Sequence, residues 1–339
     1  MKRKLIGAGL AAAVILLAGG AVRVWLTWER TRVRPVPIFM YHNIAPVDGD
    51  VWCVPPDVFE QQIRYLRAHG YSSILPSDLA ANHRWGKPLP RRPVILTFDD
   101  GYLDAAIRAE AVLKSCGFRG ICYLPTSWIA DAPETRKSYR GVECLTWPEV
   151  RAMRKRGTIT FGAHGQSHET LAGMADPFPD IAGSMKDLKD KGGIEPDSFC
   201  YPYGNYRPNT PAEVRRAGFT SAVICNDQVA KTGPELLIFE VPRVSAMGGR
   251  RKFAVTREPS GEGSDTVVFD TRDEGMPITV SPHLTGIGLA PDDGWLAPAP
   301  MAATNRTWRW TLHDKARHEP LQVEIWDVNR ILRLWPSPP

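Results

Sequence analysis

A unit of apolar strand, loop, amphipathic helix and glycine recurs between about residue 36 and residue 225. Its helical stretches end just before a glycine, as at Gly117 and Gly218. A glycine at this place supplies the left-handed backbone conformation that ends a helix. Strands that alternate with helices pack as parallel strands buried on both faces. The repeat therefore predicts an α/β fold, either a (β/α) barrel or a doubly wound sheet.

The hydrophobic patterns place the elements of this repeat along the chain. We predict strands over residues 36–41, 94–98, 121–124, 158–161, 198–203 and 220–225. We predict helices over residues 57–69, 103–115, 147–156 and 210–217.

The helical period disappears beyond residues 248–252. Short strand-like runs follow at 266–269, 278–280, 307–312, 321–326 and 331–335, and residues 327–330 can turn the last two into a hairpin. We therefore predict a small all-β module over residues 250–339. It holds Trp295, Trp308, Trp310, Trp326 and Trp335. These tryptophans either form the core of a small sandwich, the interpretation we favour, or stack on sugar rings.

Residues 1–34 have the pattern of an export segment. Lys2, Arg3 and Lys4 precede an uncharged apolar run over residues 5–22. The run is marginal for spanning a bilayer, and no clear A-x-A cleavage site follows it. We favour an uncleaved signal anchor over a cleaved signal peptide. Either one exports the chain, which is then anchored in the membrane facing the periplasm or cell exterior, or secreted if the signal is cleaved.

The charge of the chain supports the same division. The net charge is +5, but residues 1–34 hold seven of the 42 Lys and Arg residues and one of the 37 acidic residues. The remaining 35 basic and 36 acidic residues leave the body of the chain at −1. We therefore expect no nucleic-acid partner. The sequence has no phosphate-binding or dinucleotide-binding glycine motif, so we expect no nucleotide, haem or flavin.

Six cysteines are present, without a C-x-x-C pair. A zinc ribbon or a thioredoxin-like site is therefore not expected. Cys122, Cys200 and Cys225 lie in apolar runs and are expected to be small buried hydrophobes. Cys53 and Cys144 lie in loop-like sequence and are candidates for a disulfide.

Polar side chains follow several of the predicted strands directly. Asp99 and Asp100 follow residues 94–98, His164 and His168 follow the strand that begins at residue 158, and His42 follows the first strand. Reactive groups of parallel α/β folds lie at the carboxyl ends of strands. One carboxylate and two imidazoles suit a divalent metal with open positions, and a second carboxylate can serve as a base. Taken singly, the same residues would be a helix cap, surface histidines and a structural histidine.

Three motifs carry a resemblance to a known family. The sequence TFDDG is complete at Thr97–Gly101, and H-[ST]-x-x-H is present at His164–His168 with Gly165 in place of the hydroxyl residue. The motif R-x-P-Y-G is present at residues 200–204, with Cys200 in place of the arginine. Over residues 36–245 the chain resembles the polysaccharide deacetylases (carbohydrate esterase family 4, NodB homology domain). The resemblance implies a deacetylase domain over residues 35–249, shaped as a distorted seven-stranded (β/α) barrel.

Two further segments resemble the branch that contains exported poly-N-acetylglucosamine deacetylases. They are Met40-Tyr41-His42 and Val241-Pro242-Arg243-Val244. The motif order is permuted in that branch, and the histidine of the first strand takes the place of the acid found elsewhere near the domain end. His283 is a poor substitute for that acid because it lies in the β module.

The resemblance implies a role for each site residue. Asp100, His164 and His168 would hold a divalent metal, with zinc preferred. Asp99 would be the base, His42 the acid, the backbone N–H of Tyr203 an oxyanion donor, and Arg243 the partner of Asp99 in place of the missing arginine.

The implied function is removal of N-acetyl groups, as acetate, from an N-acetylglucosamine-containing polysaccharide. One alternative keeps the site but changes the bond to a non-glycan amide or an ester. Another is a membrane-tethered glycan-binding protein with an impaired site, suggested by the missing arginine but opposed by the intact metal ligands. The polymer and the oligomeric state stay open.

Overall fold

The computed structural model describes residues 19–20, 22–45, 52–226 and 228–246, and five strands between residues 253 and 326. The predicted export segment lies outside the described residues up to residue 18. The predicted strand at 331–335, the turn at 327–330 and Trp295 also lie outside them.

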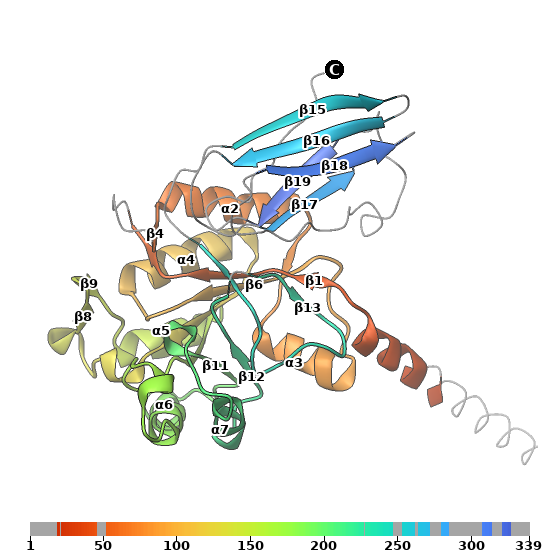
Figure 1. The fold of residues 1–339 in the computed structure, drawn as a ribbon. Coiled ribbons are helices and arrows are strands. Elements are labelled where there is room, and N and C mark those ends of the chain that lie inside the picture. Colours follow the sequence, from red (N-terminus) through yellow and green to blue (C-terminus); the bar gives the residue numbers. More distant parts are fainter. Residues whose placement is uncertain are drawn as a thin grey trace, which may run out of the picture.

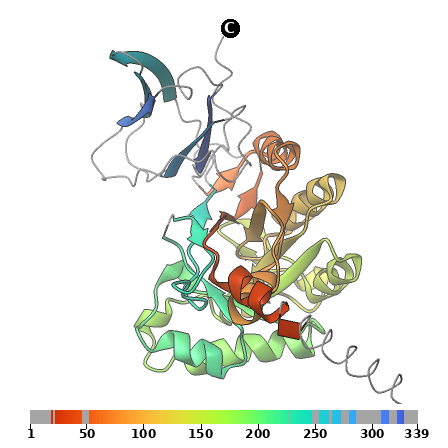
Figure 2. The ribbon, with the colours of Figure 1, turned by 90° about the vertical axis from the view of Figure 1, so that its right-hand side faces the viewer.

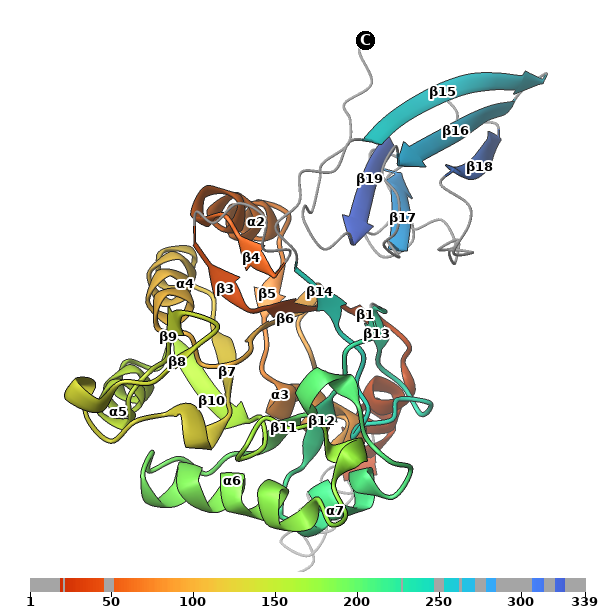
Figure 3. The ribbon, with the colours of Figure 1, turned by 60° about the vertical axis from the view of Figure 1, so that its left-hand side comes forward.

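The main sheet is parallel and curls into a barrel-like form (Figure 1, Figure 3). Its hydrogen-bonded order runs β12 (Ser221–Val223), β11 (Ser198–Cys200), β10 (Ile159–Ala163), β7 (Gly120–Leu124), β6 (Pro93–Phe98), β2 (Ile38–Tyr41) and β14 (Val244–Ser245). The short strand β5 (Ser72–Ser73) also pairs with β6. A parallel bridge between Val223 and Val241 joins β12 to the segment that leads into β14, so the two ends of the sheet approach one another. The predicted barrel-like α/β fold is confirmed, and the doubly wound alternative is not observed.

Six helices of the described chain follow or precede these strands, and all but α3 lie on the outer side of the curved sheet (Figure 3). They are α2 (Pro56–Ala68), α3 (Pro76–Trp85), α4 (Leu103–Cys116), α5 (Trp147–Arg156), α6 (Phe178–Asp190) and α7 (Thr210–Arg216). Helix α5 shows why the sequence encodes them. The Thr146–Glu149 capping box fixes its start, and Gly157, with φ of 79°, ends it.

Aliphatic and aromatic side chains fill the space between the sheet and the helices that cover it. All six residues of β6 are buried, as expected for a parallel strand covered on both faces. Tyr41 of β2 stacks on Phe98 of β6 and meets Phe59 of α2 edge to face. This packing holds the carboxyl ends of β2 and β6 side by side, and both strands lead into the candidate site.

Two predicted strands are shorter than expected because of proline. Pro37 separates β1 (Pro35–Val36), which pairs with β13 (Ala230–Lys231), from β2. Strand β11 ends at Cys200, and residues 202–204 form a 3-10 turn instead. Proline lacks the N–H that a central strand must donate. The first predicted strand is therefore interrupted at Pro37, and β11 ends before Pro202. Helices α3 and α6 were not predicted.

The C-terminal strands form two small antiparallel sheets (cyan to blue in Figure 2). The strands β15 (Phe253–Gly261), β16 (Ser264–Thr271) and β18 (Thr307–His313) make one sheet, and β17 (Thr279–Leu284) pairs with β19 (Leu321–Trp326). Strand β15 was not predicted. The boundaries of the all-β module stay a prediction.

Two further expectations have a structural outcome. All six cysteines are free thiols, so the disulfide proposed between Cys53 and Cys144 is wrong. Cys53 lies in β4 (Cys53–Val54), beside β3 (Asn43–Ile44), whereas the backbone of Cys144 forms an isolated antiparallel β-bridge with Tyr102.

Residues 22–31 form a helix, and no described helix is both long and apolar enough to cross a membrane.

Candidate active site

The two aspartates leave the end of β6 in different directions. Asp99 keeps an ordinary backbone, whereas Asp100 and Gly101 have φ of 70° and 66° before α4 begins at Leu103. A left-handed conformation is unfavourable for an aspartate and persists only where the surrounding structure imposes it. The turn gives the two adjacent carboxylates separate environments.

Asp99 is held by a buried arginine, Arg243, that directly precedes β14. Arg243 donates from Nη1 to Oδ1 and from Nη2 to Oδ2 of Asp99, both at 2.8 Å. The guanidinium is fully buried, and it also contacts Thr97 Oγ1 at 2.9 Å and Cys200 Sγ at 3.0 Å. Arg243 therefore occupies the space beside Cys200, at the motif position where the family has its arginine.

This pairing sets the charge of Asp99. Burial alone would raise the pKa of the carboxyl, but the charge and hydrogen bonds of Arg243 outweigh it, and the pKa of Asp99 lies well below its usual range. Asp99 is consequently an anion at neutral pH, with both oxygens fixed in position.

Asp100 faces two imidazoles. Its Oδ1 atom lies 3.2 Å from Nε2 of His168 and 3.6 Å from Nε2 of His164. All three side chains are buried, and one donor atom from each lies within 4.8 Å of the others. Among the described residues, buried Oδ1 of Asp100 has no well-formed hydrogen bond. An unsatisfied buried carboxylate oxygen facing two ring nitrogens fits a divalent cation.

The histidines are prepared to act as neutral ligands. Nδ1 of His164 lies 2.8 Å from the carbonyl oxygen of Cys200, which requires a proton on Nδ1 and leaves Nε2 with its lone pair. Burial and the neighbouring His168 lower the pKa of His164 to about 4, so its ring is uncharged at neutral pH. His168 itself has a left-handed backbone conformation, with φ of 63°.

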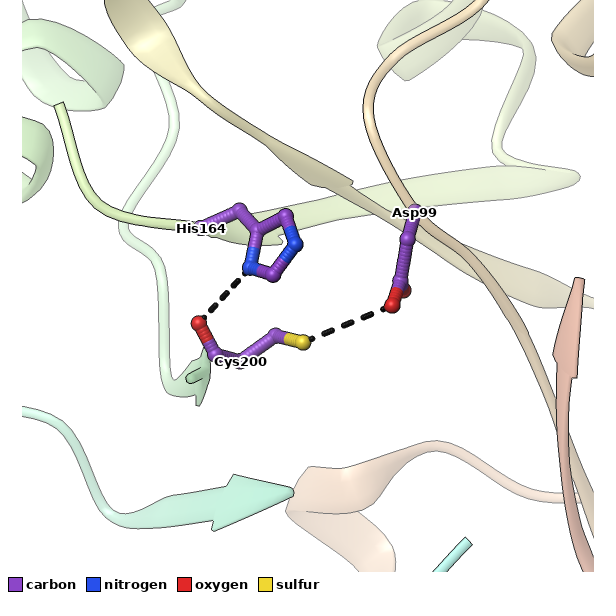
Figure 4. A group of neighbouring side chains, drawn as sticks. All are labelled: Asp99, His164 and Cys200. Carbon is purple, nitrogen blue, oxygen red and sulfur yellow. Dashed lines mark hydrogen bonds between the residues drawn. The ribbon is translucent and has the colours of Figure 1, made fainter. Parts of the chain in front are cut away.

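A second trio of donor atoms, Asp99, His164 and Cys200, also lies close together (Figure 4). It fits a cation less well. Both oxygens of Asp99 already accept from Arg243, and burial raises the pKa of the Cys200 thiol far above its usual value. A thiol must lose its proton to bind a metal. The trio of Asp100, His164 and His168 is therefore the better metal site.

The predicted residues line one cavity of about 220 Å³. His42 reaches it from the end of β2, with its ring 4.8 Å from that of Trp52. Tyr203 reaches it from the turn after β11, with φ of 58° and its ring 4.7 Å from that of His168. Arg243 lies behind Asp99 and is not part of the cavity wall. The structure thus brings all seven predicted site residues together, either in the wall or directly behind it.

Some residues of the cavity wall were not predicted from the sequence. They are Met40, Asn43, Trp52, Tyr102, Tyr139, Arg140, Val142 and Cys225. Tyr139, Arg140 and Val142 come from a hairpin of β8 (Ser138–Tyr139) and β9 (Val142–Glu143). Its only signal in the sequence is the Arg140-Gly141 pair, because each strand has just two residues.

The fold and the site define a class of hydrolases whose reactive groups lie at the carboxyl ends of parallel barrel strands. The polysaccharide deacetylase family model matches residues 86–222, which include both aspartates and both histidines. The family predicted from the motifs is therefore confirmed over these residues.

Individual relatives make the likeness more specific. YxkH of Bacillus subtilis, assigned by name to the polysaccharide deacetylases, is 25% identical over 65% of this chain and 75% of its own length. The poly-beta-1,6-N-acetyl-D-glucosamine N-deacetylase of Escherichia coli is 24% identical over 53% of this chain, but this chain spans only 32% of that protein. IcaB from Ammonifex degensii shares the fold with a TM-score of 0.53 at 23% identity, over 62% of this chain and 91% of its own.

Proposed function

We propose that the chain is a metal-dependent hydrolase that removes N-acetyl groups from an N-acetylglucosamine-containing polysaccharide and releases acetate. The observation that carries the proposal is the pair of contrasting carboxylates in one cavity. Asp100 faces His164 and His168, while Asp99 is fixed by Arg243.

In this proposal Asp100, His164 and His168 hold the cation. Two nitrogen donors and one oxygen donor, with room left for substrate, make a typical catalytic zinc set. A bound divalent cation supplies Lewis-acid polarisation of the acetamide carbonyl. The neutral His164 and the unsatisfied Asp100 oxygen support this assignment.

Asp99 is the proposed base, which accepts a proton from the attacking water. Its low pKa keeps it ionised and able to accept, and the bidentate contact with Arg243 fixes its direction. Arg243 acts as a positioning residue in this proposal, because it lies behind Asp99 and outside the cavity wall.

The remaining roles belong to His42 and Tyr203. His42 lines the cavity from the β2 side, and the proposal assigns it proton transfer to the departing amine. The backbone N–H of Tyr203, in the turn after β11, is the proposed donor to the oxyanion. The products are acetate and a free amine on the sugar.

Two other interpretations differ in what they require. A change of bond to a non-glycan amide or an ester would leave the same seven residues in place. An impaired glycan-binding protein was suggested by the missing motif arginine, but the contact of Arg243 with Asp99 removes that reason. The proposal also places the chain outside the cytoplasm, tethered or released by residues 1–34, as expected from their sequence.

The test is acetate release from N-acetylglucosamine oligomers, measured before and after treatment with a chelator and after readdition of Zn²⁺. We expect release that stops on chelation and returns with the metal. Deacetylation of a simple acetamide or acetyl ester without turnover of the oligomers would favour the changed-bond alternative. Oligomer binding without acetate release would favour the glycan-binding one.

A further inference from the structure

The β8–β9 hairpin places a positively charged side chain, Arg140, in the wall of the cavity. Tyr139, Arg140 and Val142 line the cavity together with the catalytic groups. The electrostatic neighbours of Arg140 include Tyr102 and Tyr203, both of which also face the cavity. The guanidinium therefore lies near the place where a sugar next to the reacting acetamide would bind.

The backbone of this hairpin puts an arginine where the turn disfavours one. Arg140 and Gly141 have φ of 50° and 79°, and they link two-residue strands in the manner of a type I′ turn. Asparagine, aspartate and glycine are preferred at the first of these positions. A positive φ at an arginine costs about 1 kcal/mol or more. This unfavourable conformation thus occurs at a residue that lines the candidate active-site cavity.

The hairpin is also held firmly by its base. Arg136 forms two hydrogen bonds with Glu149, at 2.9 Å and 2.7 Å, and a third with the carbonyl oxygen of Cys144 at 2.8 Å. Tyr139 stacks on Trp128 with ring centroids 4.0 Å apart. The position of Arg140 is thus set by packing on both sides of the turn.

Arg140 lacks an anionic partner within the described part of the chain. Arg136 is paired with Glu149 and Arg156 with Glu110, whereas Arg140, like several other exposed arginines, forms no salt bridge with a described residue. Its guanidinium lies over the ring of the neighbouring Tyr139, 5.4 Å from the ring centroid.

We propose that Arg140 is a specificity residue that binds an anionic group, a carboxylate or a phosphate, on the sugar next to the N-acetylated one. The guanidinium fork suits bidentate binding of either anion. The half-exposed ring of Tyr203 offers an adjacent face for the sugar itself. This inference rests on the proposed deacetylase function and narrows its substrate to an acidic glycan.

The experiment compares three substrates in four proteins. The substrates are N-acetylglucosamine oligomers, oligosaccharides that alternate N-acetylglucosamine with glucuronic acid, and N-acetylglucosamine disaccharides with a phosphate on the second sugar. The proteins are the wild type, Arg140→Asn, Arg140→Lys and the control Arg119→Asn. Asparagine tolerates a positive φ, so the hairpin should be retained. Arg119 is an exposed arginine just before β7, at the opposite end of the barrel.

We expect Arg140→Asn to lower kcat/KM for the preferred acidic substrate about tenfold, as for loss of one charge-assisted contact. The neutral oligomers should change less than about threefold. Arg140→Lys should keep much of the preference, and Arg119→Asn should behave as wild type. The wild-type preference should also weaken as salt is added. The better of the two acidic substrates identifies the anion.

Two results would overturn the inference. One is a wild type that turns over neutral and acidic substrates equally, with no change in their ratio in Arg140→Asn. The other is an equal loss on all three substrates, which would assign the hairpin a purely structural role. A wild type that releases acetate from none of them would instead reject the deacetylase function on which the inference rests.

Discussion

Asp99 and Asp100 are neighbours in the chain but opposites in their surroundings. Asp99 receives two hydrogen bonds from a fully buried guanidinium. Asp100 faces two imidazoles and keeps a buried oxygen without a well-formed hydrogen bond among the described residues. Both carboxyl groups have a pKa below their usual value, despite burial, but for different reasons. The pKa of Asp99 is lowered chiefly by a permanent charge, and that of Asp100 by histidines.

The difference shows which charge the protein supplies itself. Arg243 neutralises Asp99 within the fold, so this carboxylate can stay anionic without any ligand. In the described chain Asp100 has no arginine or lysine partner, and it faces two imidazoles whose nitrogen atoms can bind a cation together with it. Arg243 thus fixes the position of the Asp99 carboxylate, whereas the Asp100 carboxylate is left free to bind a cation.

The largest effect on catalysis is expected from removing the Asp100 carboxylate. Asp100→Asn should remove the cation and lower acetate release by roughly 10³-fold or more, because Lewis-acid stabilisation is worth several kcal/mol. Metal content and initial rates measure this. The control is Asp104→Asn, an exposed residue of the first turn of α4, which should keep both. Full metal content in Asp100→Asn would place the cation elsewhere.

A smaller effect is expected from His42, which faces both carboxylates from β2. His42→Ala should lower kcat by about 10²-fold or more, the usual contribution of an acid or base, without loss of metal. The control His83→Ala changes a histidine of α3, outside the cavity wall. Wild-type turnover in His42→Ala would refute the assignment of this histidine as the acid.

Loss of the ion pair between Arg243 and Asp99 should lower the stability of the fold. Arg243→Met leaves a buried carboxylate unpaired and should lower the free energy of unfolding by about 3–5 kcal/mol. The exposed pair of Arg64 and Glu60 gives the control, since Arg64→Ala should cost at most about 1 kcal/mol. Urea denaturation at pH 7 compares the two. Equal losses would contradict the special role of the buried pair.

The same variant should shift the pH dependence of catalysis. In the wild type the pKa of Asp99 is depressed, so the stabilising ion pair is complete at neutral pH and is lost only as pH falls through that low value. Without Arg243, burial dominates and raises the pKa of Asp99. The acid limb of the kcat/KM profile should therefore move to higher pH in Arg243→Met. An unchanged acid limb would mean that Asp99 is not the base.

The smallest effect concerns the cysteines. Because all six are free thiols, a reducing agent should leave the melting temperature of the purified protein unchanged. Thiol titration under denaturing conditions without reductant should find six groups. A count of four would indicate a disulfide.

The strand–helix repeat was sufficient to predict the fold, and the strand-end side chains were sufficient to predict which residues form the candidate metal site. Helix α5 could be placed to the residue because its capping box and final glycine are local signals. Helix α6 was missed because Pro177 and Pro179 lie at its start and Gly183 interrupts its apolar pattern. Helix α3 was missed because its buried face includes the polar Asn82, which bonds to the carbonyl oxygen of Lys87.

The parts of the site that depend on distant contacts were harder to foresee. Arg243 reaches Asp99 across 144 positions of sequence, and only the fold brings them together. Cys200 leaves room beside Asp99 for that guanidinium, which a motif comparison registers only as a missing arginine. The β8–β9 hairpin has strands too short for any periodicity, so the sequence indicates it only through the Arg140-Gly141 pair.

The contrast between the two carboxylates is tested most directly by measuring bound zinc and acetate release together in Asp99→Asn. Asparagine keeps the shape of Asp99 but cannot accept the proton. The account predicts one metal ion per chain, as in the wild type, and a loss of acetate release of at least about 10²-fold. Full activity in this variant, or loss of the metal as in Asp100→Asn, would contradict it.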